Sequence, residues 1–358
     1  MSEKQLFIYF LSQFDLNSSK IEYILSCLKN NVTFAHFCKY KFDEKQISKQ
    51  LLDKMLPLAE ERFAKAYLEN LECLGIKLIC KLDENYPKKF DCMADYPFFL
   101  FYKGDLSLID KKCLSVVGTR LPSNYGRMVT NKFVGELAQN GVVIVSGLAY
   151  GIDSIAHRKT LEVGGKTIAI LGSGLNNIYP SEHQDLANQI AEKGLLISEY
   201  CPSTKATKFT FPVRNRIIAG ISDGVLIVEA GLKSGTLYTR DYALDYGKDV
   251  FAVPGNIDSL KSALPNEIIC SGQGMGVVEP KSILNQLKVD TKNLSKQTVV
   301  ELSFEENVVY KFLESGAKDF EFLEKNCNLP INLLNSCLTM LEIRGIISRM
   351  PGGMFCLR

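Results

Sequence analysis

The sequence predicts an α/β fold with a parallel sheet between helical domains, and three observations carry this prediction. No glycine precedes Gly75, and the apolar residues before it recur at helical spacing. The middle of the chain alternates short, β-branched apolar runs with helical stretches. The last part returns to a helical pattern and closes on two apolar runs around a turn.

The composition is that of a globular chain with nearly balanced charge. Its 358 residues suggest two or three domains, with 46% hydrophobic and 23% charged residues. The 42 Lys and Arg against 40 Asp and Glu give a net charge of +2, which excludes a wholly basic nucleic-acid binder but not a local basic groove. Because the longest apolar run near the start, Leu6 to Leu11, is too short for a signal peptide or a membrane span, we expect a cytoplasmic protein without membrane contact.

The cysteines point to neither a metal site nor a disulfide framework. The 11 cysteines are scattered from Cys27 to Cys356, and no two are spaced as CxxC. Zinc sites and redox motifs need close spacing, whereas disulfide frameworks occur in short secreted chains. We therefore expect reduced, mostly buried thiols and no metal.

The N-terminal segment is predicted to be a helical domain. Leu6, Tyr9, Phe10 and Phe14 recur at the spacing of one helix face. The change from a glycine-free, Lys-rich composition to a glycine-rich one places the end of this domain near residue 72. We therefore expect a helical domain over residues 1–72.

Residues 73–290 are predicted to form a Rossmann-like domain. Short continuous apolar runs are typical of strands that are covered on both faces. Their alternation with helical stretches implies a parallel sheet with right-handed crossovers, and Ser123 can cap the helix after the second run. The predicted strand runs are KLIC (77–80), LSVVGTR (114–120), VVIVSGLAYG (142–151), TIAILGSG (167–174), LLISEY (195–200), VLIVEAG (225–231) and VFAVPG (250–255).

The end of the chain is predicted to be a linker and a small domain. Residues 291–299 are polar and lack periodicity, as linkers do. Residues 300–358 read as three helices followed by a hairpin around Pro-Gly-Gly, the pattern of a winged helix. From Thr298 to Arg358, eight acidic residues outnumber six basic ones. Because a DNA-reading wing needs clustered positive charge, we expect this domain to contact protein or to regulate.

The ends of the predicted strands carry the first candidate site residues. Ligands of open parallel sheets bind outside the carboxyl ends of the strands. Glycines there let a ligand approach the backbone, and the N–H groups of the following helices favour an anion. The candidates from these loops are Gly118, Thr119, Arg120, Ser146, Gly147, Gly172 and Gly174.

Two nucleotide-binding motifs can be tested and rejected. Gly172-x-Gly174 lacks the third glycine of GxGxxG because position 177 is Asn. The GGKT run at 164–167 has no glycine at position 160 and precedes a strand, whereas a Walker A motif follows one. We therefore expect no cofactor and no NTPase chemistry.

The basic segment at 205–220 is the most informative part of the sequence. No acidic residue occurs between Tyr200 and Ser222. Guanidinium groups suit phosphate oxygens, and aromatic rings suit unstacked bases. A solvated basic loop is the alternative, but Arg120 at a neighbouring strand end favours a phosphate-binding groove. The candidates from this segment are Lys205, Lys208, Phe211, Arg214, Asn215 and Arg216.

A catalytic group is harder to identify. Asp153 and His157 lie one helical turn apart and could pair, but no Ser or Cys partner is evident, so a helix-surface histidine is the simpler interpretation. Glu229 ends a strand close to Ser234-Gly235-Thr236. It could act as an acid, bind a ribose or cap the helix that SGT begins.

Seven motifs in this order resemble those of the DNA-processing protein A family, also called DprA or Smf. The resemblance implies a helical, SAM-like N-terminal domain, a Rossmann-like DNA-binding domain and, in many members, a C-terminal winged helix. The motifs are YPKKF (86–90), SVVGTR (115–120), VSGLAYGID (145–153), AILGSGLNNIYP (169–180), FPVRNRIIAG (211–220), LIVEAGLKSGTL (226–237) and DVFAVPGNID (249–258).

The resemblance also implies a function. Such a protein is a homodimer that binds and protects incoming single-stranded DNA and loads RecA onto it in natural transformation, without covalent chemistry. By position, its DNA pocket would use Arg120, Ser146-Gly147, Lys208, Arg214 and Arg216. The segment 259–277 departs from the family pattern, which puts the path of the chain there in question.

The DNA-binding hypothesis gives quantitative expectations. Four phosphates neutralised by these Arg and Lys side chains would give a slope of log K against log salt of about −2.8 for single strands. On the sequence alone, replacing Arg120 or Arg214 by Ala should weaken DNA binding with little loss of stability.

Two other classes of function compete with DNA binding. One is a nucleoside monophosphate N-glycosidase, whose family carries PGGxGTxxE. GLKSGTLYT (231–239) has the GT but lacks PGG and places Tyr238-Thr239 where the acid would follow. The other is a scaffold that couples partners through its end domains without binding DNA.

Overall fold

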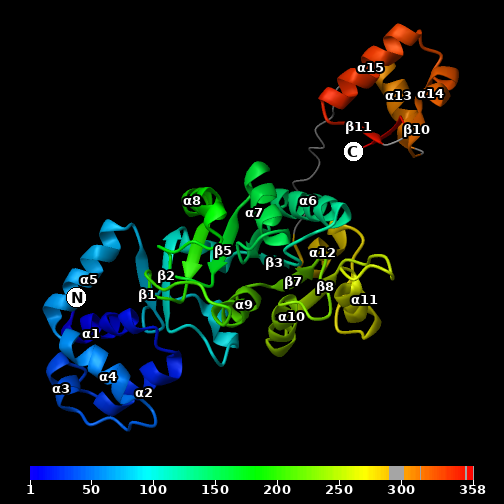
Figure 1. Ribbon diagram of the computed structural model, residues 1–358. Helices are drawn as coiled ribbons and strands as arrows, with labels where there is room; N and C mark the ends of the chain where they lie inside the picture. The colour runs from blue at the N-terminus through cyan, green and yellow to red at the C-terminus, as the bar shows by residue number, and fades with distance from the viewer. Residues whose placement is uncertain (290–301, 315, 351–352, 358) are drawn as a thin grey trace. The chain divides into compact units, whose positions relative to one another are not determined.

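In the computed structural model, the apolar runs of the middle segment are the strands of one large sheet (Figure 1). The structure describes residues 1–289, 302–314, 316–350 and 353–357. All seven predicted strand runs contain a strand. The strands of this sheet are β1 (Lys77–Cys80), β2 (Phe99–Gly104), β3 (Cys113–Val117), β4 (Val143–Ser146), β5 (Thr167–Leu171), β6 (Leu195–Ser198), β7 (Gly224–Ile227), β8 (Asp249–Ala252) and β9 (Met275–Gly276).

The strand order is β1-β2-β6-β5-β4-β3-β7-β8-β9. From β3 the chain moves through β4 and β5 to β6, and then returns to place β7 on the other side of β3. Strand β3 pairs in parallel with both neighbours, so that Leu114 lies opposite Ile144 on one side and Gly224 on the other. The connections therefore change direction between β3 and β7, and crevices at the carboxyl ends of strands near such a point bind ligands in this class of sheet.

Two strands of this sheet were not predicted. Strand β2 runs antiparallel to both β1 and β6, so the sheet is mostly parallel and not wholly so. Its sequence FLFYKG is a short apolar run that ends in Lys and Gly. No helical pattern follows it, so the alternation of strands and helices does not identify it as a strand. Strand β9 has only two residues and lies in the divergent segment 259–277, which also holds a helix.

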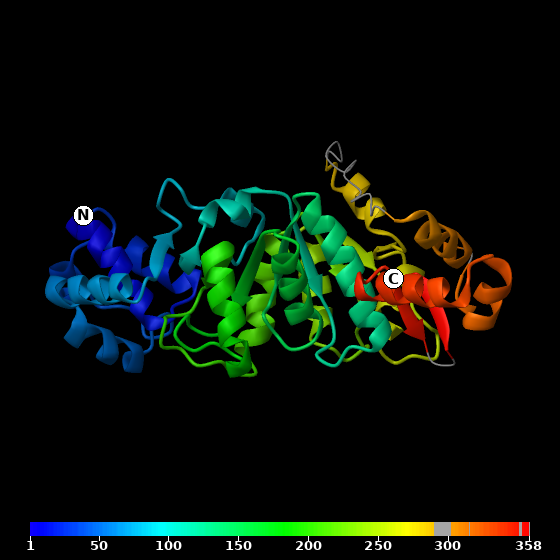
Figure 2. The ribbon, with the colours of Figure 1, turned by 90° about the horizontal axis from the view of Figure 1, so that it is seen from above.

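Helices cover both faces of the sheet (Figures 1 and 2). Helices α9, α10 and α11 pack on one face, and α6, α7, α8 and α12 pack on the other. Ser123 caps α6 as predicted, because its hydroxyl accepts a hydrogen bond from the Gly126 N–H. The helices are α6 (Asn124–Gln139), α7 (Ile152–Glu162), α8 (Gln184–Lys193), α9 (Thr210–Gly220), α10 (Thr236–Asp245), α11 (Ala263–Cys270) and α12 (Pro280–Gln286).

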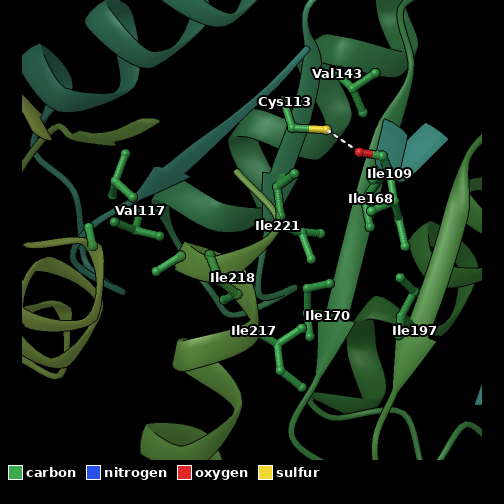
Figure 3. Close-up of a cluster of buried hydrophobic side chains, with 14 of the residues drawn as sticks. Ile109, Cys113, Val117, Val143, Ile168, Ile170, Ile197, Ile217, Ile218 and Ile221 are labelled. Carbon is green, nitrogen blue, oxygen red and sulfur yellow. Dashed lines mark hydrogen bonds between the residues drawn. The ribbon is translucent and has the colours of Figure 1, made fainter. Parts of the chain in front are cut away.

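The core between α9 and the sheet is made of β-branched side chains (Figure 3). Ile217 and Ile218 of α9 pack with Ile170 of β5 and Ile197 of β6 in one buried cluster. Each such side chain stabilises the fold by about 1.5–3 kcal/mol when it is fully buried. This packing fixes the start of α9, where the basic segment lies, against the carboxyl ends of the strands.

The N-terminal segment is helical, as the apolar spacing predicts. Its core is aromatic, with the rings of Phe7 and Phe34 5.3 Å apart. The same cluster includes Phe98 and Phe99, so these helices pack on the β1–β2 end of the sheet. The helices are α1 (Glu3–Leu11), α2 (Ser18–Leu28), α3 (Phe34–Lys39), α4 (Lys49–Met55) and α5 (Glu61–Cys73), with short 3₁₀ turns such as η1 (Ser12–Phe14) and η2 (Leu56–Leu58).

The chain divides into two units, Met1–Thr291 and Lys292–Arg358. The boundary expected near residue 72 lies inside the first unit and stays a prediction, and the linker expected at 291–299 lies outside the described residues. The second unit has three helices on a small antiparallel sheet of order β10-β12-β11 around its own core. Its elements are α13 (Phe304–Glu314), β10 (Lys318–Asp319), α14 (Phe320–Asn326), α15 (Ile331–Ile343), β11 (Ile347–Met350) and β12 (Met354–Leu357).

The expectation of mostly buried thiols is wrong. All 11 cysteines are free, but only four of them are buried, and four are exposed. The periodicity of apolar runs does not distinguish a buried position from one at the edge of a helix face. Within the described residues, no three His, Cys or acidic side chains are grouped so that they could hold a metal. No helix in the same part of the chain has the length and apolar character to cross a bilayer.

His157 is a core residue and not the helix-surface histidine expected from the sequence. It lies on α7 with none of its surface exposed, and its Nδ1 is 2.7 Å from the Thr167 hydroxyl of β5. No hydrogen bond joins it to Asp153, whose carboxylate instead accepts from the Gly147 N–H at 3.0 Å. Burial lowers the pKa of His157 to about 3, aided by the nearby charges of His183 and Arg214.

His157 should make the fold sensitive to mild acid. Its folded pKa lies below the unfolded value of about 6.5, so stability is present above that pH and is lost as the pH falls. When the pH falls from about 7.5 to about 5.5, this side chain should lower the unfolding free energy by about 1.4 kcal/mol. Urea unfolding of wild type and His157→Gln at the two pH values checks this. The variant should be less stable than the wild type at both pH values, but its unfolding free energy should decrease less on acidification. Equal decreases in the two proteins would contradict the buried, neutral state of His157.

Candidate nucleic-acid interface

A cleft of about 680 Å³ opens at the carboxyl ends of β3 and β4, between them and the starts of α9 and α10. The cations Arg120, Lys208 and Arg214 line it, and Asp153 is its only acidic lining residue. Since Asp153 is buried and its carboxylate accepts from the Gly147 N–H, the accessible wall of the cleft is positive. Seven of the predicted site residues meet here, namely Gly118, Thr119, Arg120, Lys208, Phe211, Arg214 and Asn215.

Arg214 is built into the wall of the cleft. Only 4% of its surface is exposed, and its Nη1 donates to the Gly147 carbonyl at 2.7 Å and to the Ile170 carbonyl. The Gly147 carbonyl directly follows β4, and the Ile170 carbonyl lies in β5. One guanidinium thus joins two strands to α9. Burial lowers its pKa to about 10, with Asp153 opposing the shift, so it stays charged at neutral pH. Burial raises the pKa of Asp153, and the charge of Arg214 opposes this.

Phe211 forms an aromatic surface inside the cleft. Its ring is 5.5 Å from the Tyr179 ring, and the Arg120 guanidinium lies 5.6 Å from its centroid. Tyr179 is about half exposed, and Arg120 is exposed, so both can meet a ligand. A guanidinium above an aromatic ring is a favourable pair, and it places a cation beside a face on which a planar ring can stack.

The glycines at the strand ends serve packing as well as access. A Cβ on Gly147 would lie 2.5 Å from Nη2 of Arg214. A Cβ on Gly172 would lie 2.9 Å from the ring of Phe211. The sequence predicts that a ligand approaches these glycines, but side chains of α9 fill the space beside them. Gly174 likewise lies against the backbone of Cys201 and Pro202, away from the cleft.

Three other predicted site residues lie outside the cleft. Ser146 is fully buried, and its hydroxyl donates to the Val116 carbonyl at 2.7 Å. Arg216 is 6% exposed and pairs with Glu199 at 2.5 Å and Asp95 at 3.3 Å. Lys205 is exposed at a neighbouring depression that it shares with Tyr179.

The sequence reasoning missed several lining residues. Tyr179 follows β5 in the AILGSGLNNIYP motif, which we used only for its glycines. Ser234 and Gly235 of the loop before α10, and Thr236 at the start of α10, also line the cleft. The SGT run at 234–236 is the sequence signal for them, because small polar residues at a helix start are typical of anion-binding loops.

Glu229 belongs to a second cleft and binds Ser123, the N-cap residue of α6, and it does not cap the helix that SGT begins. Its carboxylate accepts hydrogen bonds from the N–H of Ser123, at 2.9 Å, and from the hydroxyl of Ser123. This cleft, of about 590 Å³, has no Lys or Arg in its lining. Both carboxylate oxygens already accept from Ser123, so the geometry assigns Glu229 a structural role.

Comparison with known proteins agrees with the fold. Residues 77–288 match the sequence model of the family described as DNA recombination-mediator protein A. The chain belongs to this family. Protein Smf of Escherichia coli (strain K12) is 39% identical over 286 residues, which cover 77% of this chain and 76% of that one. DNA processing protein DprA of Bacillus subtilis (strain 168) is 41% identical over 59% of this chain and 70% of its own length.

Two solved structures of the family resemble this one. The X-ray structure of DNA processing protein A from Streptococcus pneumoniae has 32% identity and a TM-score of 0.68, covering 80% of this chain and 98% of that one. A structure of the Helicobacter pylori protein, which concerns its single-stranded DNA binding mode, has 35% identity and a TM-score of 0.55, covering 60% and 95%. The recombination-mediator fold is thus shared over most of the first unit.

The two cleft arginines of this family member should differ in their effect on stability. Arg214→Ala leaves Asp153 buried without its cation and should lower the unfolding free energy by about 3–5 kcal/mol. Arg120→Ala changes an exposed side chain and should change it by less than about 0.5 kcal/mol. Urea unfolding at neutral pH measures both. The sequence alone suggested that both changes are harmless to folding, and equally small losses would contradict the buried role of Arg214.

Proposed function

We propose that this chain binds single-stranded DNA in the cleft at the carboxyl ends of β3 and β4. The observation that carries the proposal is the wall itself, with exposed Arg120 and Lys208 beside the Phe211–Tyr179 pair. The cations can neutralise phosphates of the DNA backbone, and unpaired bases can stack on the faces of the two rings. The relatives named as DNA processing proteins and the DNA-binding Helicobacter pylori structure support it.

Each side chain has a distinct part in this mechanism. Arg120 and Lys208 reach phosphates directly, and the exposed Lys205 extends the basic track past Tyr179. Arg214 contributes a fixed positive charge from behind the wall and orders the loops that form it. The preference for single strands follows because bases in a duplex cannot turn their faces to Phe211 and Tyr179.

The wider role follows the family. We propose that the chain forms a homodimer, protects incoming DNA in natural transformation and loads RecA onto it. The three helices and small sheet of the second unit would form a winged helix. With eight acidic residues against six basic ones from Thr298 to Arg358, this unit would contact protein rather than DNA.

The proposal includes no bond cleavage. A hydrolase of nucleotides needs an acid that can reach the glycosidic bond. The acid lining this cleft is Asp153, whose carboxylate is buried and accepts from the Gly147 N–H at 3.0 Å. The cleft therefore favours binding over catalysis.

Nucleoside monophosphates incubated with the full chain should release no free base above the level of a protein-free control. Chromatographic separation of base from nucleotide measures this. Base release that persists in Arg120→Ala but disappears in Glu229→Gln would support the glycosidase instead.

The salt dependence of binding should reflect three exposed cations. Contacts by Arg120, Lys205 and Lys208 give a slope of log K against log salt of about −2.1, below the value of about −2.8 for four contacts. Arg120→Ala or Lys208→Ala should each reduce the slope by about 0.7 and weaken binding at moderate salt. Fluorescence anisotropy of a labelled oligothymidylate, titrated at several salt concentrations, measures both quantities.

Lys281→Ala is the matched control, since it removes the same charge from α12, whose residues do not line the cleft. Its slope should remain that of the wild type. A wild type that prefers duplex DNA, or a slope near zero, would count against the proposal.

A further inference from the structure

One carboxylate of the N-terminal helical segment binds the loop that precedes the basic segment. Asp15 follows η1 and precedes α2, and both of its oxygens accept hydrogen bonds from the loop after β6. Oδ1 accepts from the N–H of Cys201 at 2.7 Å, and Oδ2 accepts from the hydroxyl of Thr204 at 2.6 Å. A single side chain thus connects parts of the chain that are 186 residues apart.

The loop that Asp15 holds leads directly into the cations of the cleft. Between the end of β6 at Ser198 and the start of α9 at Thr210, the chain has neither helix nor strand. Its path therefore depends on individual contacts. Lys205 directly follows Thr204, and Lys208 lies four positions after Thr204. A shift of Thr204 therefore moves both cations.

Contacts from two sides hold this loop. On the β5 side, the Gly174 N–H donates to the Thr204 carbonyl at 2.8 Å, and the Asn176 N–H donates to the Pro202 carbonyl at 3.1 Å. On the other side, Asp15 supplies both of the hydrogen bonds just described. The peptide contacts cannot be removed by substitution, whereas the Asp15 contacts depend on one carboxylate and one hydroxyl.

The backbone of Asp15 is itself in an unusual conformation. Its φ of 44° and ψ of 44° lie in the left-handed region, which most residues avoid and which Asp and Asn tolerate. Asn can therefore replace Asp15 without new backbone strain. This makes Asp15→Asn a change of charge and of hydrogen-bonding capacity only.

We propose that Asp15 is a positioning residue for DNA binding, whose carboxylate holds residues 201–204 so that Lys205 and Lys208 stay beside the cleft. This inference rests on the proposed function. It assigns the N-terminal helices a part in DNA binding without any contact between them and DNA.

Charge and position predict opposite effects of removing this carboxylate. A carboxylate beside a phosphate-binding cleft repels DNA, so removal of its charge alone would tighten binding. If Asp15 acts by position, its loss lets the two lysines move, and binding weakens although the net charge becomes more positive. Whether DNA binding becomes tighter or weaker therefore distinguishes a charge effect of Asp15 from a positioning effect.

The test compares five full-length proteins by oligothymidylate anisotropy over a range of salt: the wild type, Thr204→Val, Thr204→Ser, Asp15→Asn and Arg120→Ala. Thr204→Val removes the hydroxyl at nearly constant shape and charge, and should weaken binding about five-fold, the effect of losing one hydrogen bond to a charged group at a partly exposed site. Thr204→Ser keeps the hydroxyl and should bind like the wild type. Asp15→Asn can keep both contacts as weaker neutral hydrogen bonds, with Oδ1 accepting from the Cys201 N–H and Nδ2 donating to the Thr204 hydroxyl, so it should weaken binding less than Thr204→Val does.

The salt slope distinguishes positioning from a general loss of structure. A folded variant whose lysines have moved contacts fewer phosphates, so its slope should fall by about 0.7 for each lost contact. Partial unfolding would lower the active fraction without changing the slope, and thermal unfolding of each variant shows whether it occurs. Unchanged or tighter binding by Asp15→Asn and Thr204→Val, with Arg120→Ala still weakened, would overturn the inference alone. A wild type that does not bind the oligonucleotide would overturn the proposed function as well.

Discussion

The site depends on one buried guanidinium. Arg214 projects from α9 into the carboxyl edge of the sheet and donates to the carbonyls of Gly147 and Ile170. A charge in this position costs several kcal/mol of desolvation unless it is paired, and Asp153 provides the opposite charge. Gly147 must lack a side chain because the guanidinium occupies that space. The loops after β4 and β5 and the start of α9 are therefore parts of one arrangement.

The cations of the site fall into two groups, those buried in the fold and those accessible to a ligand. Arg214 and Arg216 are both buried. Arg214 holds α9 to the sheet through the carbonyls of Gly147 and Ile170, and Arg216 pairs with Glu199 and Asp95. The accessible cations are Arg120, Lys205 and Lys208. A chain with a formal charge of only +2 can therefore present a positive cleft, because the acid that lines the cleft is buried while three cations at and beside the cleft are exposed.

The sequence predicted the architecture better than the roles of single residues. Short β-branched runs identified the parallel strands because strands buried on both faces must be apolar along their length. Residue types at strand ends identified the cleft. Charge pattern alone could not show that Arg214 and Arg216 are buried, since their partners lie at distant positions such as Asp153 and Glu199. The pattern of strands and helices missed β2 because this antiparallel strand, which lies between β1 and β6, is not followed by a crossover helix such as those between the parallel strands.

Hydrogen exchange of the full chain, with and without an oligothymidylate, tests the central claim most directly, because it locates the bound strand without altering a residue. DNA in this cleft should slow exchange in peptides that contain the loops after β3 and β4 and in residues 205–211. The helices of the second unit should exchange as before. Protection confined to residues 302–357, or to the N-terminal helices, with the cleft unchanged, would contradict the account.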